Sequence, residues 1–329
     1  MHPPALALFG GSVIWLVLSQ IIAARAASGL SMRYFTLSTE PVLSSIFFLF
    51  LLVLGFYMLD GIGVRRSEMR VLLGLPRRDT ALEEWGTGAA IGWGAVLLAA
   101  LVMALAGTLH VEIWTAPRAF TLLLLNLVAL AVGALAEEIA FRGYPYRRLI
   151  ESAGSTVATV IMAVLFGLAH LLNPAATWIS VLITMLAGVL LCAGWLRTHG
   201  LWLSWGLHFA WNASMGVLFG LPVSGLHTFS SIVETRAIGP RWITGGSYGP
   251  EASVLTLIAL LLAIVALVWL TRDYAWNYTH PSIVPGGYPM DVAPPPAHAA
   301  MEAKAVIQPS LVQILPSTPR NRSVDETHS

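Results

Sequence analysis

Long apolar runs dominate this sequence and restrict what it can fold into. A helix that crosses a bilayer needs about 20 mostly apolar residues, and eight segments of the chain approach that length. They lie at roughly 5–24, 43–62, 88–106, 120–141, 157–172, 178–196, 201–220 and 254–270. Only 11% of the residues are charged, whereas a soluble domain has about 25%. The sequence therefore predicts an all-α, polytopic membrane helix bundle with about eight transmembrane helices.

Charge and cysteine content exclude several other classes of protein. The chain has 18 Lys and Arg against 17 Asp and Glu, for a net charge of +1, so it has no basic surface for nucleic acid. Its one cysteine, Cys192, excludes an intrachain disulfide and a cysteine-rich metal site, and its apolar surroundings predict a packing role. The expected partner is the lipid bilayer.

The distribution of arginine and proline predicts the topology and the domain boundaries. Five arginines lie between the second and third spans: Arg65, Arg66, Arg70, Arg77 and Arg78. By the positive-inside rule that loop, and both termini with it, is predicted to be cytoplasmic. We expect N-terminal spans and a basic loop in 1–83, a core in 84–276 and a disordered, Pro-rich tail in 277–329. The lysine-poor, Ala- and Arg-rich composition is typical of GC-rich bacterial genomes and favours a bacterial inner membrane.

The fourth span contains two adjacent carboxylates and an arginine in a run of apolar residues. Ionisable groups at membrane depth are costly and usually face a cavity or the bundle interior. Glu138 and Arg142 are four residues apart, so they can pair on one helix face as a structural support. Glu137 is rotated by about 100° from Glu138 and has no basic partner on its own helix. We therefore expect Glu137 to be available for chemistry.

Three further polar side chains lie in neighbouring spans. His170 ends the fifth span, and His208 and Asn212 share one face of the seventh. If the fourth span continues as helix to the interfacial Arg147, with a kink at Pro145, Glu137 lies about 15 Å deep, His170 about 20 Å and Asn212 about 16 Å. These depths predict that the four groups meet in one cavity.

Such a set of side chains supports the hydrolysis of an amide. Glu137 and the histidines can activate water as general bases, and Asn212 with a histidine can stabilise the oxyanion. Alternatively, Glu137, His170 and His208 can hold Zn²⁺ with an open position for water. The sequence leaves both mechanisms open. It excludes an H-E-x-x-H zincin, a G-x-S-x-G hydrolase and a membrane Ser–Lys dyad, because the only lysine is Lys304 in the tail.

The same groups also allow a function without proteolysis. Intramembrane carboxylates and histidines form proton relays in transporters, and a bacteriocin immunity or scaffold protein is a further alternative. A transporter is typically built from inverted repeats or broken helices in two halves, and the sequence contains neither.

Three ordered motifs resemble those of the CPBP family, which includes CAAX prenyl endopeptidases and bacteriocin-processing (Abi) proteins. They are Glu137-Glu138-x-x-x-Arg142, Phe166-x-x-x-His170 and His208-x-x-x-Asn212. The resemblance covers roughly 84–272. It implies an intramembrane endopeptidase of the metallo or glutamate type that cleaves a peptide or lipidated protein near the membrane. It also implies that the first glutamate activates water, helped by the histidine at 170, while His208 and Asn212 hold the oxyanion or a metal.

Two flanking features have simpler interpretations. The segment 245–251 is also similar to the CPBP family, but its glycines and proline predict a structural loop opposite the cytoplasm, with Glu251 at the positive end of the last span. The aromatics around His208 are expected to pack as a membrane belt, with a greasy substrate groove as the alternative. They are Trp202, Trp205, Phe209 and Trp211.

Overall fold

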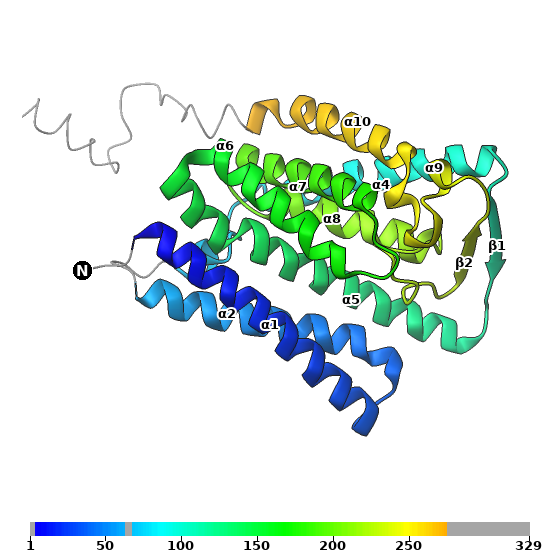
Figure 1. Ribbon diagram of the computed structural model, residues 1–329, viewed down its shortest axis with the longest axis horizontal. Helices are drawn as coiled ribbons and strands as arrows, with labels where there is room; N and C mark the ends of the chain where they lie inside the picture. The colour runs from blue at the N-terminus through cyan, green and yellow to red at the C-terminus, as the bar shows by residue number, and fades with distance from the viewer. Residues whose placement is uncertain (1–3, 63–67, 275–329) are drawn as a thin grey trace, which may run out of the picture. The chain divides into compact units, whose positions relative to one another are not determined.

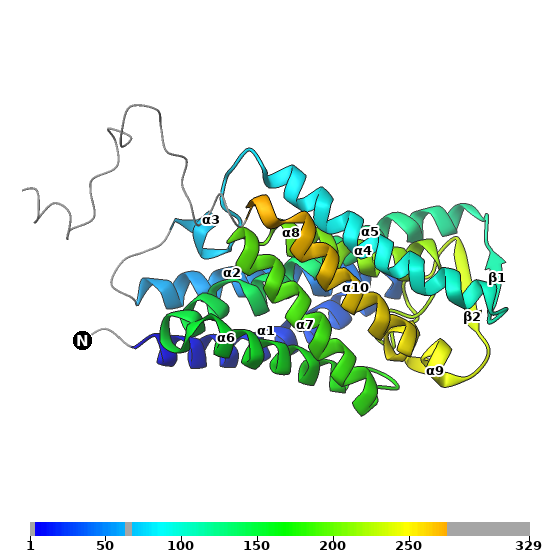
Figure 2. The same ribbon diagram turned by 90° about the horizontal axis from the view of Figure 1, so that it is seen from above.

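The computed structural model describes residues 4–62 and 68–274, and nearly all of this chain is helical (Figures 1 and 2). The long helices are α1 (Ala5–Tyr34), α2 (Glu40–Gly61), α4 (Ala81–Leu105), α5 (Pro117–Arg142), α6 (Tyr144–Ala169), α7 (Trp178–Thr198), α8 (Trp202–Ala213) and α10 (Val254–Leu270). Two single-turn helices are α3 (Met69–Leu72) and α9 (Arg241–Thr244). Each of the eight predicted apolar segments overlaps one of the long helices.

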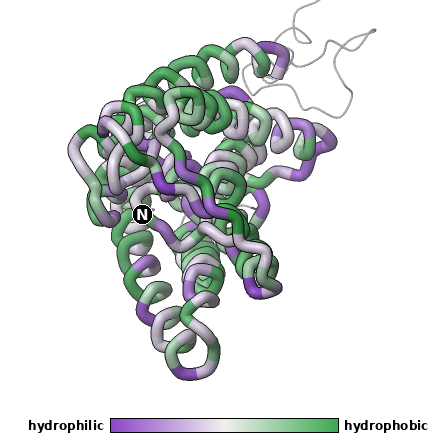
Figure 3. The backbone as a smooth tube through the Cα atoms, turned by 90° about the vertical axis from the view of Figure 1, so that its right-hand side faces the viewer, coloured by the Kyte–Doolittle hydropathy of each residue, from purple (hydrophilic) through white to green (hydrophobic). Residues whose placement is uncertain are grey.

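The apolar character of these helices confirms a membrane helix bundle. Within the described residues, five helical stretches are long and apolar enough to cross a membrane, and one of them, Pro117–Leu172, includes both α5 and α6. Figure 3 shows apolar residues along most of the helices. The α8 helix has 12 residues and α10 has 17, so both are shorter than a typical span. The fold class is therefore confirmed, while the count of eight stays a prediction.

The fourth and fifth predicted spans are separated by a sharper break than expected. The continuous helix with a kink at Pro145, which the depth estimate assumed, does not occur, because α5 ends at Arg142 and Gly143 has non-helical angles (φ −83°, ψ −125°). Proline fits the first turn of a new helix, where no amide hydrogen bond is lost, so α6 begins at Tyr144. A second break at Gly154 (φ 80°) divides α6, and its apolar part follows that break.

Glycines bring α4 and α8 into backbone contact, and α8 carries His208. A Cβ atom on Gly88 would lie 2.0 Å from the Leu203 carbonyl oxygen, and one on Gly92 would lie 2.3 Å from that of Leu207. Small residues spaced four apart allow this close approach between membrane helices. The α4–α8 contact therefore fixes the helix that carries His208, while α5 packs against α2, α6 and α8.

A small antiparallel sheet was missed by the sequence interpretation. Strand β1 (Leu109–Ile113) follows α4 and pairs with β2 (Val233–Ala237), which lies between α8 and α10. Four of the five β1 residues are exposed, so the strand lacks a buried face and the period-two pattern that would reveal it. The predicted tail, 277–329, and Arg65 and Arg66 of the basic loop lie outside the described residues.

Candidate active site

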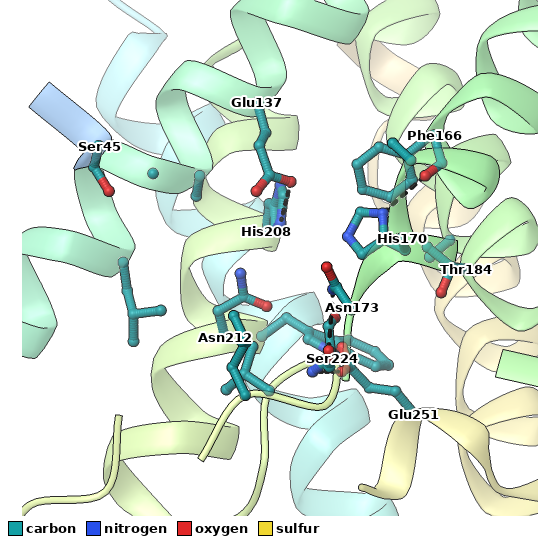
Figure 4. A pocket seen from close by; sticks show the side chains of 18 of the residues that line it. Ser45, Glu137, Phe166, His170, Asn173, Thr184, His208, Asn212, Ser224 and Glu251 are labelled. Atoms are coloured by element: carbon teal, nitrogen blue, oxygen red, sulfur yellow. Dashed lines mark hydrogen bonds and ion pairs between the residues drawn. The ribbon is translucent and has the colours of Figure 1, made fainter. Parts of the chain in front are cut away.

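The predicted site residues surround one cavity of about 650 Å³. Glu137 enters it from α5, His170 from the end of α6, and His208 and Asn212 from α8. Figure 4 shows these four side chains around a common space. The cavity extends to α1 and α2, which contribute Gln20 and Ser44 to its lining. The structure thus brings together the residues that the sequence placed on three separate helices.

One side of His208 belongs to a closed network of charges. Its Nδ1 lies 2.8 Å from Glu138 Oε1, and Arg142 Nη1 lies 3.1 Å from the same oxygen. The side chains of Glu138 and Arg142 have no exposed surface, and Arg142 Nη2 also donates to the Gly188 carbonyl at 3.3 Å. The ion pair expected from the four-residue spacing is present. The carboxylate is an acceptor, so Nδ1 is assigned as the protonated ring nitrogen.

The other side of His208 faces Glu137. Its Nε2 lies 3.8 Å from Glu137 Oε2, which is too far for a direct hydrogen bond. That oxygen has no hydrogen-bond partner in the described chain, while the Glu137 side chain as a whole is 37% exposed. Because Nδ1 carries the ring proton, Nε2 presents a lone pair to the cavity. His208 therefore links a buried carboxylate to an accessible one.

His170 is oriented by the end of its own helix. It begins the 3₁₀ turn His170–Leu172, and its Nδ1 donates to the Phe166 carbonyl at 2.8 Å. The Phe166 ring packs on the His170 ring with centroids 4.6 Å apart, and the Arg142 guanidinium lies 4.3 Å from the same phenyl centroid. This packing leaves Nε2 of His170 as the free acceptor. Figure 4 shows it directed toward the cavity.

Asn212 lies one helical turn beyond His208 on α8 and lines the same cavity. After Ala213 the helix continues as a π-helical turn, Ser214–Leu218. Such wider turns occur frequently at functional sites. The turn follows directly after the residue that the sequence assigned to oxyanion binding.

The predicted zinc ligands do not form a metal site in this arrangement. Among residues 4–62 and 68–274, no group of three His, Cys, Asp or Glu side chains lies close enough together to hold a metal ion. Glu137, His170 and His208 could each offer one free atom, but they are not gathered around one point. The use of zinc therefore stays a prediction from the sequence.

Sequence reasoning missed a second polar cluster on the cavity wall, opposite Glu137. Glu251 was assigned to a helix end, yet it lines the cavity and accepts from the Trp211 indole at 3.0 Å and from the Ser224 backbone N–H. Asn173 donates to the Ser224 carbonyl at 3.0 Å. Nearby, burial raises the pKa of the Tyr248 hydroxyl to about 12, so this group stays protonated at neutral pH. The available signals were the acidic residue before the last apolar segment and the likeness of 245–251 to the CPBP family.

The aromatics around His208 pack α8 against its neighbours, and their place in a membrane belt stays a prediction. The Trp202 indole donates to the Pro76 carbonyl at 3.0 Å, and the Trp205 indole donates to the Ala131 carbonyl at 3.0 Å. Phe209 packs on Trp85 with ring centroids 5.9 Å apart. Since an indole N–H inside a bundle needs an acceptor, these rings hold α8 to its neighbours. Of the four, only Trp211 lines the described cavity.

A comparison with known protein families agrees with this geometry. Residues 118–214 match the family model described as "Type II CAAX prenyl endopeptidase Rce1-like". That segment contains Glu137, His170, His208 and Asn212. No curated protein and no solved structure matches the chain. The match agrees with the resemblance drawn from the three motifs: this segment is similar to CAAX prenyl endopeptidases, and the long apolar helices are those of an integral membrane protein.

Proposed function

We propose that the protein is an intramembrane endopeptidase in which Glu137 activates a water molecule inside the cavity. The proposal depends on one observation, the position of His208 between two glutamates. Glu138 holds Nδ1 at 2.8 Å, and Nε2 faces Glu137 Oε2 at 3.8 Å. This arrangement fixes both the tautomer and the direction of the imidazole.

A single water molecule would satisfy both of these acceptors, including Glu137 Oε2, which is buried and has no partner among the described residues. Two atoms 3.8 Å apart can both lie about 2.8 Å from the same water oxygen. The water then donates one hydrogen to Glu137 and the other to His208 Nε2. Both of its lone pairs stay free, so it can attack a carbonyl carbon that faces the cavity.

The reaction then balances with protein side chains alone. As the water oxygen bonds to the carbonyl carbon, Glu137 takes a proton, and the carbonyl oxygen becomes an oxyanion. In this proposal the Asn212 amide donates to that oxyanion, and His170 Nε2 accepts from the substrate N–H. Glu137 returns its proton to the leaving nitrogen when the C–N bond breaks. The products are a carboxylic acid and an amine.

The substrate class follows from the position of the cavity among the membrane helices. A peptide segment that reaches the cavity must enter from the bilayer or from its surface. We propose a peptide or lipidated protein cleaved near the membrane of a bacterial cell, with both termini of the enzyme in the cytoplasm. Prenylation of the substrate is a separate question that the experiment below addresses.

The test is cleavage by the full-length chain reconstituted in liposomes. The probe is a fluorogenic peptide with a CAAX-type end, supplied with and without a farnesyl group. We expect Glu137→Gln and His208→Ala each to lower kcat by about 10³-fold, because they remove a proton acceptor that acts on the attacking water. Glu112→Gln, at an exposed position of β1, is the matched control and should keep full activity.

Unchanged turnover in both site variants would contradict the proposal. Equal cleavage of the two peptides would support an endopeptidase that does not require a prenyl group. Hydrolysis of neither peptide by the wild-type chain, with solute flux through the same liposomes, would favour the transporter alternative.

A further inference from the structure

Glu251 is a charged side chain on the cavity wall that the proposed reaction does not use. It lies in the 3₁₀ turn Pro250–Ala252, directly before α10. One carboxylate oxygen accepts from the Trp211 indole at 3.0 Å, and the other accepts from the Ser224 backbone N–H. Both oxygens are therefore engaged by donors from two separate segments of the chain. A carboxylate held in this way is suited to fixing geometry.

The Ser224 partner belongs to a tight turn that is anchored on both sides. Ser224 has a left-handed backbone (φ 48°), which is uncommon for a non-glycine residue. Its carbonyl accepts from Asn173 Nδ2 at 3.0 Å, and the next amide, that of Gly225, donates to the Tyr248 carbonyl at 2.8 Å. Asn173 lies three residues after His170. The turn therefore connects the end of α6 to the segment that contains Glu251.

The Trp211 partner lies next to Asn212 on α8. Trp211 is buried, and the regular helix changes to the π-helical turn Ser214–Leu218 just beyond Asn212. A helix end with this altered hydrogen bonding relies on tertiary contacts to fix its rotation. The bond from Trp211 to Glu251 is such a contact. Figure 4 shows Asn212, Ser224 and Glu251 at the same end of the cavity.

We infer that Glu251 is a positioning residue that holds Asn212 in the orientation needed to stabilise the oxyanion, acting through Trp211 and the Ser224 turn. This inference rests on the proposed function. It assigns a catalytic consequence to a residue that lies outside 118–214, the segment matched by the family model. Because the two bonds of Glu251 keep Trp211 and the turn in place, their loss should affect the transition state more than substrate binding.

The test is a double-mutant cycle between Glu251 and Asn212, measured with the liposome assay and the fluorogenic peptide. Glu251→Gln can satisfy one of the two donors but not both. We expect about a tenfold loss of kcat in the wild-type background, with KM changed by less than about threefold. In the Asn212→Ala background, the same substitution should lower kcat by less than about twofold. Asn212→Ala alone should cost about a hundredfold.

Glu234→Gln is the matched control. Glu234 on β2 also accepts from an indole, that of Trp114 at 3.2 Å, but this pair is exposed and does not line the cavity. We expect its kcat to equal that of the wild type. If Glu251→Gln reduces the folded yield too far, Trp211→Phe removes the indole donor together with part of the ring, keeps an aromatic side chain at this position, and should give the same loss of kcat and the same coupling to Asn212.

Three outcomes would overturn the inference. An equal loss of kcat in both backgrounds would show that Glu251 does not act through Asn212. A raised KM with unchanged kcat would make Glu251 a binding residue. A lower folded yield with wild-type kcat per folded molecule would leave it a purely structural role. Failure of the proposed function gives a different result, because Glu137→Gln would then cleave as fast as the wild type.

Discussion

The two ring nitrogens of His208 face two different regions of the protein. On the Nδ1 side, Glu138 and Arg142 have no exposed surface and are bonded to each other. On the Nε2 side, Glu137 has a side chain that is 37% exposed and lies beside a cavity. On the closed side the charges of Glu138 and Arg142 are paired. On the open side Glu137 Oε2 is an acceptor without a donor among the described residues. Two adjacent glutamates of one helix therefore have different roles.

The difference follows from the cost of burying charge. An ionised carboxylate inside a low-dielectric bundle must be paired and hydrogen-bonded, and Glu138 is paired and bonded at Oε1 by Arg142 and His208, while its Oε2 has no hydrogen-bond partner among the described residues. Protonation of such a carboxylate would leave its buried cationic partner without a counter-charge, which is equally costly. Glu137 has no such partners, so it can take and return a proton. The predictions below alter one side or both, and they are checked by stability, by turnover, or by both.

The largest expected effect on the closed side is that of Arg142→Met. Removing the guanidinium leaves the buried Glu138 charge without its cation, which costs about 3–5 kcal/mol of stability. The measurement is the unfolding free energy in detergent micelles. Arg272→Met is the control, since Arg272 is 74% exposed and, among the residues that the structure describes, pairs with its exposed neighbour Asp273. A loss no larger than that of the control would show that the closed side does not support the fold.

His170→Ala should have an intermediate effect, confined to the open side. His170 is half-buried at the cavity and bonds only to a backbone carbonyl of its own helix. We expect kcat to fall by about a hundredfold, with no change in the unfolding temperature. His110→Ala, on the exposed strand β1, should keep full activity. A wild-type kcat in His170→Ala would show that this histidine takes no part in the reaction.

Gly92→Ala should have the smallest effect of the three, and it should alter both the closed and the open side of His208. The new Cβ would lie 2.3 Å from the Leu207 carbonyl oxygen, so α8 must shift and carry His208 with it. We expect a loss of about 1–3 kcal/mol in stability, and about a tenfold lower kcat per folded molecule. Gly94→Ala lies on the same helix with no atom within 4 Å of its Cβ and should not lower either quantity. Equal behaviour of the two variants would argue against a role for this contact.

Much of the fold was predictable because membrane helices follow composition. Each predicted span contains a helix, and the last one, Val254–Leu270, has the predicted bounds. The break at Gly143 and the strand pair were not predicted. A glycine two residues before a proline allows either a kink or the end of a helix, and the residues of β1 are mostly exposed. These features depend on tertiary contacts that a local pattern does not contain.

The site was predictable in its residue set but not in its connections. The estimated membrane depths and the shared helix faces predicted that four side chains meet: Glu137, His170, His208 and Asn212. The structure has all four lining one cavity. The bond from Glu138 to His208 joins residues 70 positions apart, and no spacing rule reaches that far. The same limit applies to the bond between Trp211 and Glu251.

The most direct test of the contrast between the two sides compares Glu137→Gln with Glu138→Gln, measuring kcat per folded molecule and unfolding free energy for both. Our account predicts that Glu137→Gln lowers kcat by about 10³-fold with wild-type stability. It predicts that Glu138→Gln lowers stability by about 1–3 kcal/mol, because a buried cation loses its counter-charge, while kcat falls by less than about tenfold. The reverse pattern, with Glu138→Gln fully folded and inactive and Glu137→Gln active, would contradict it.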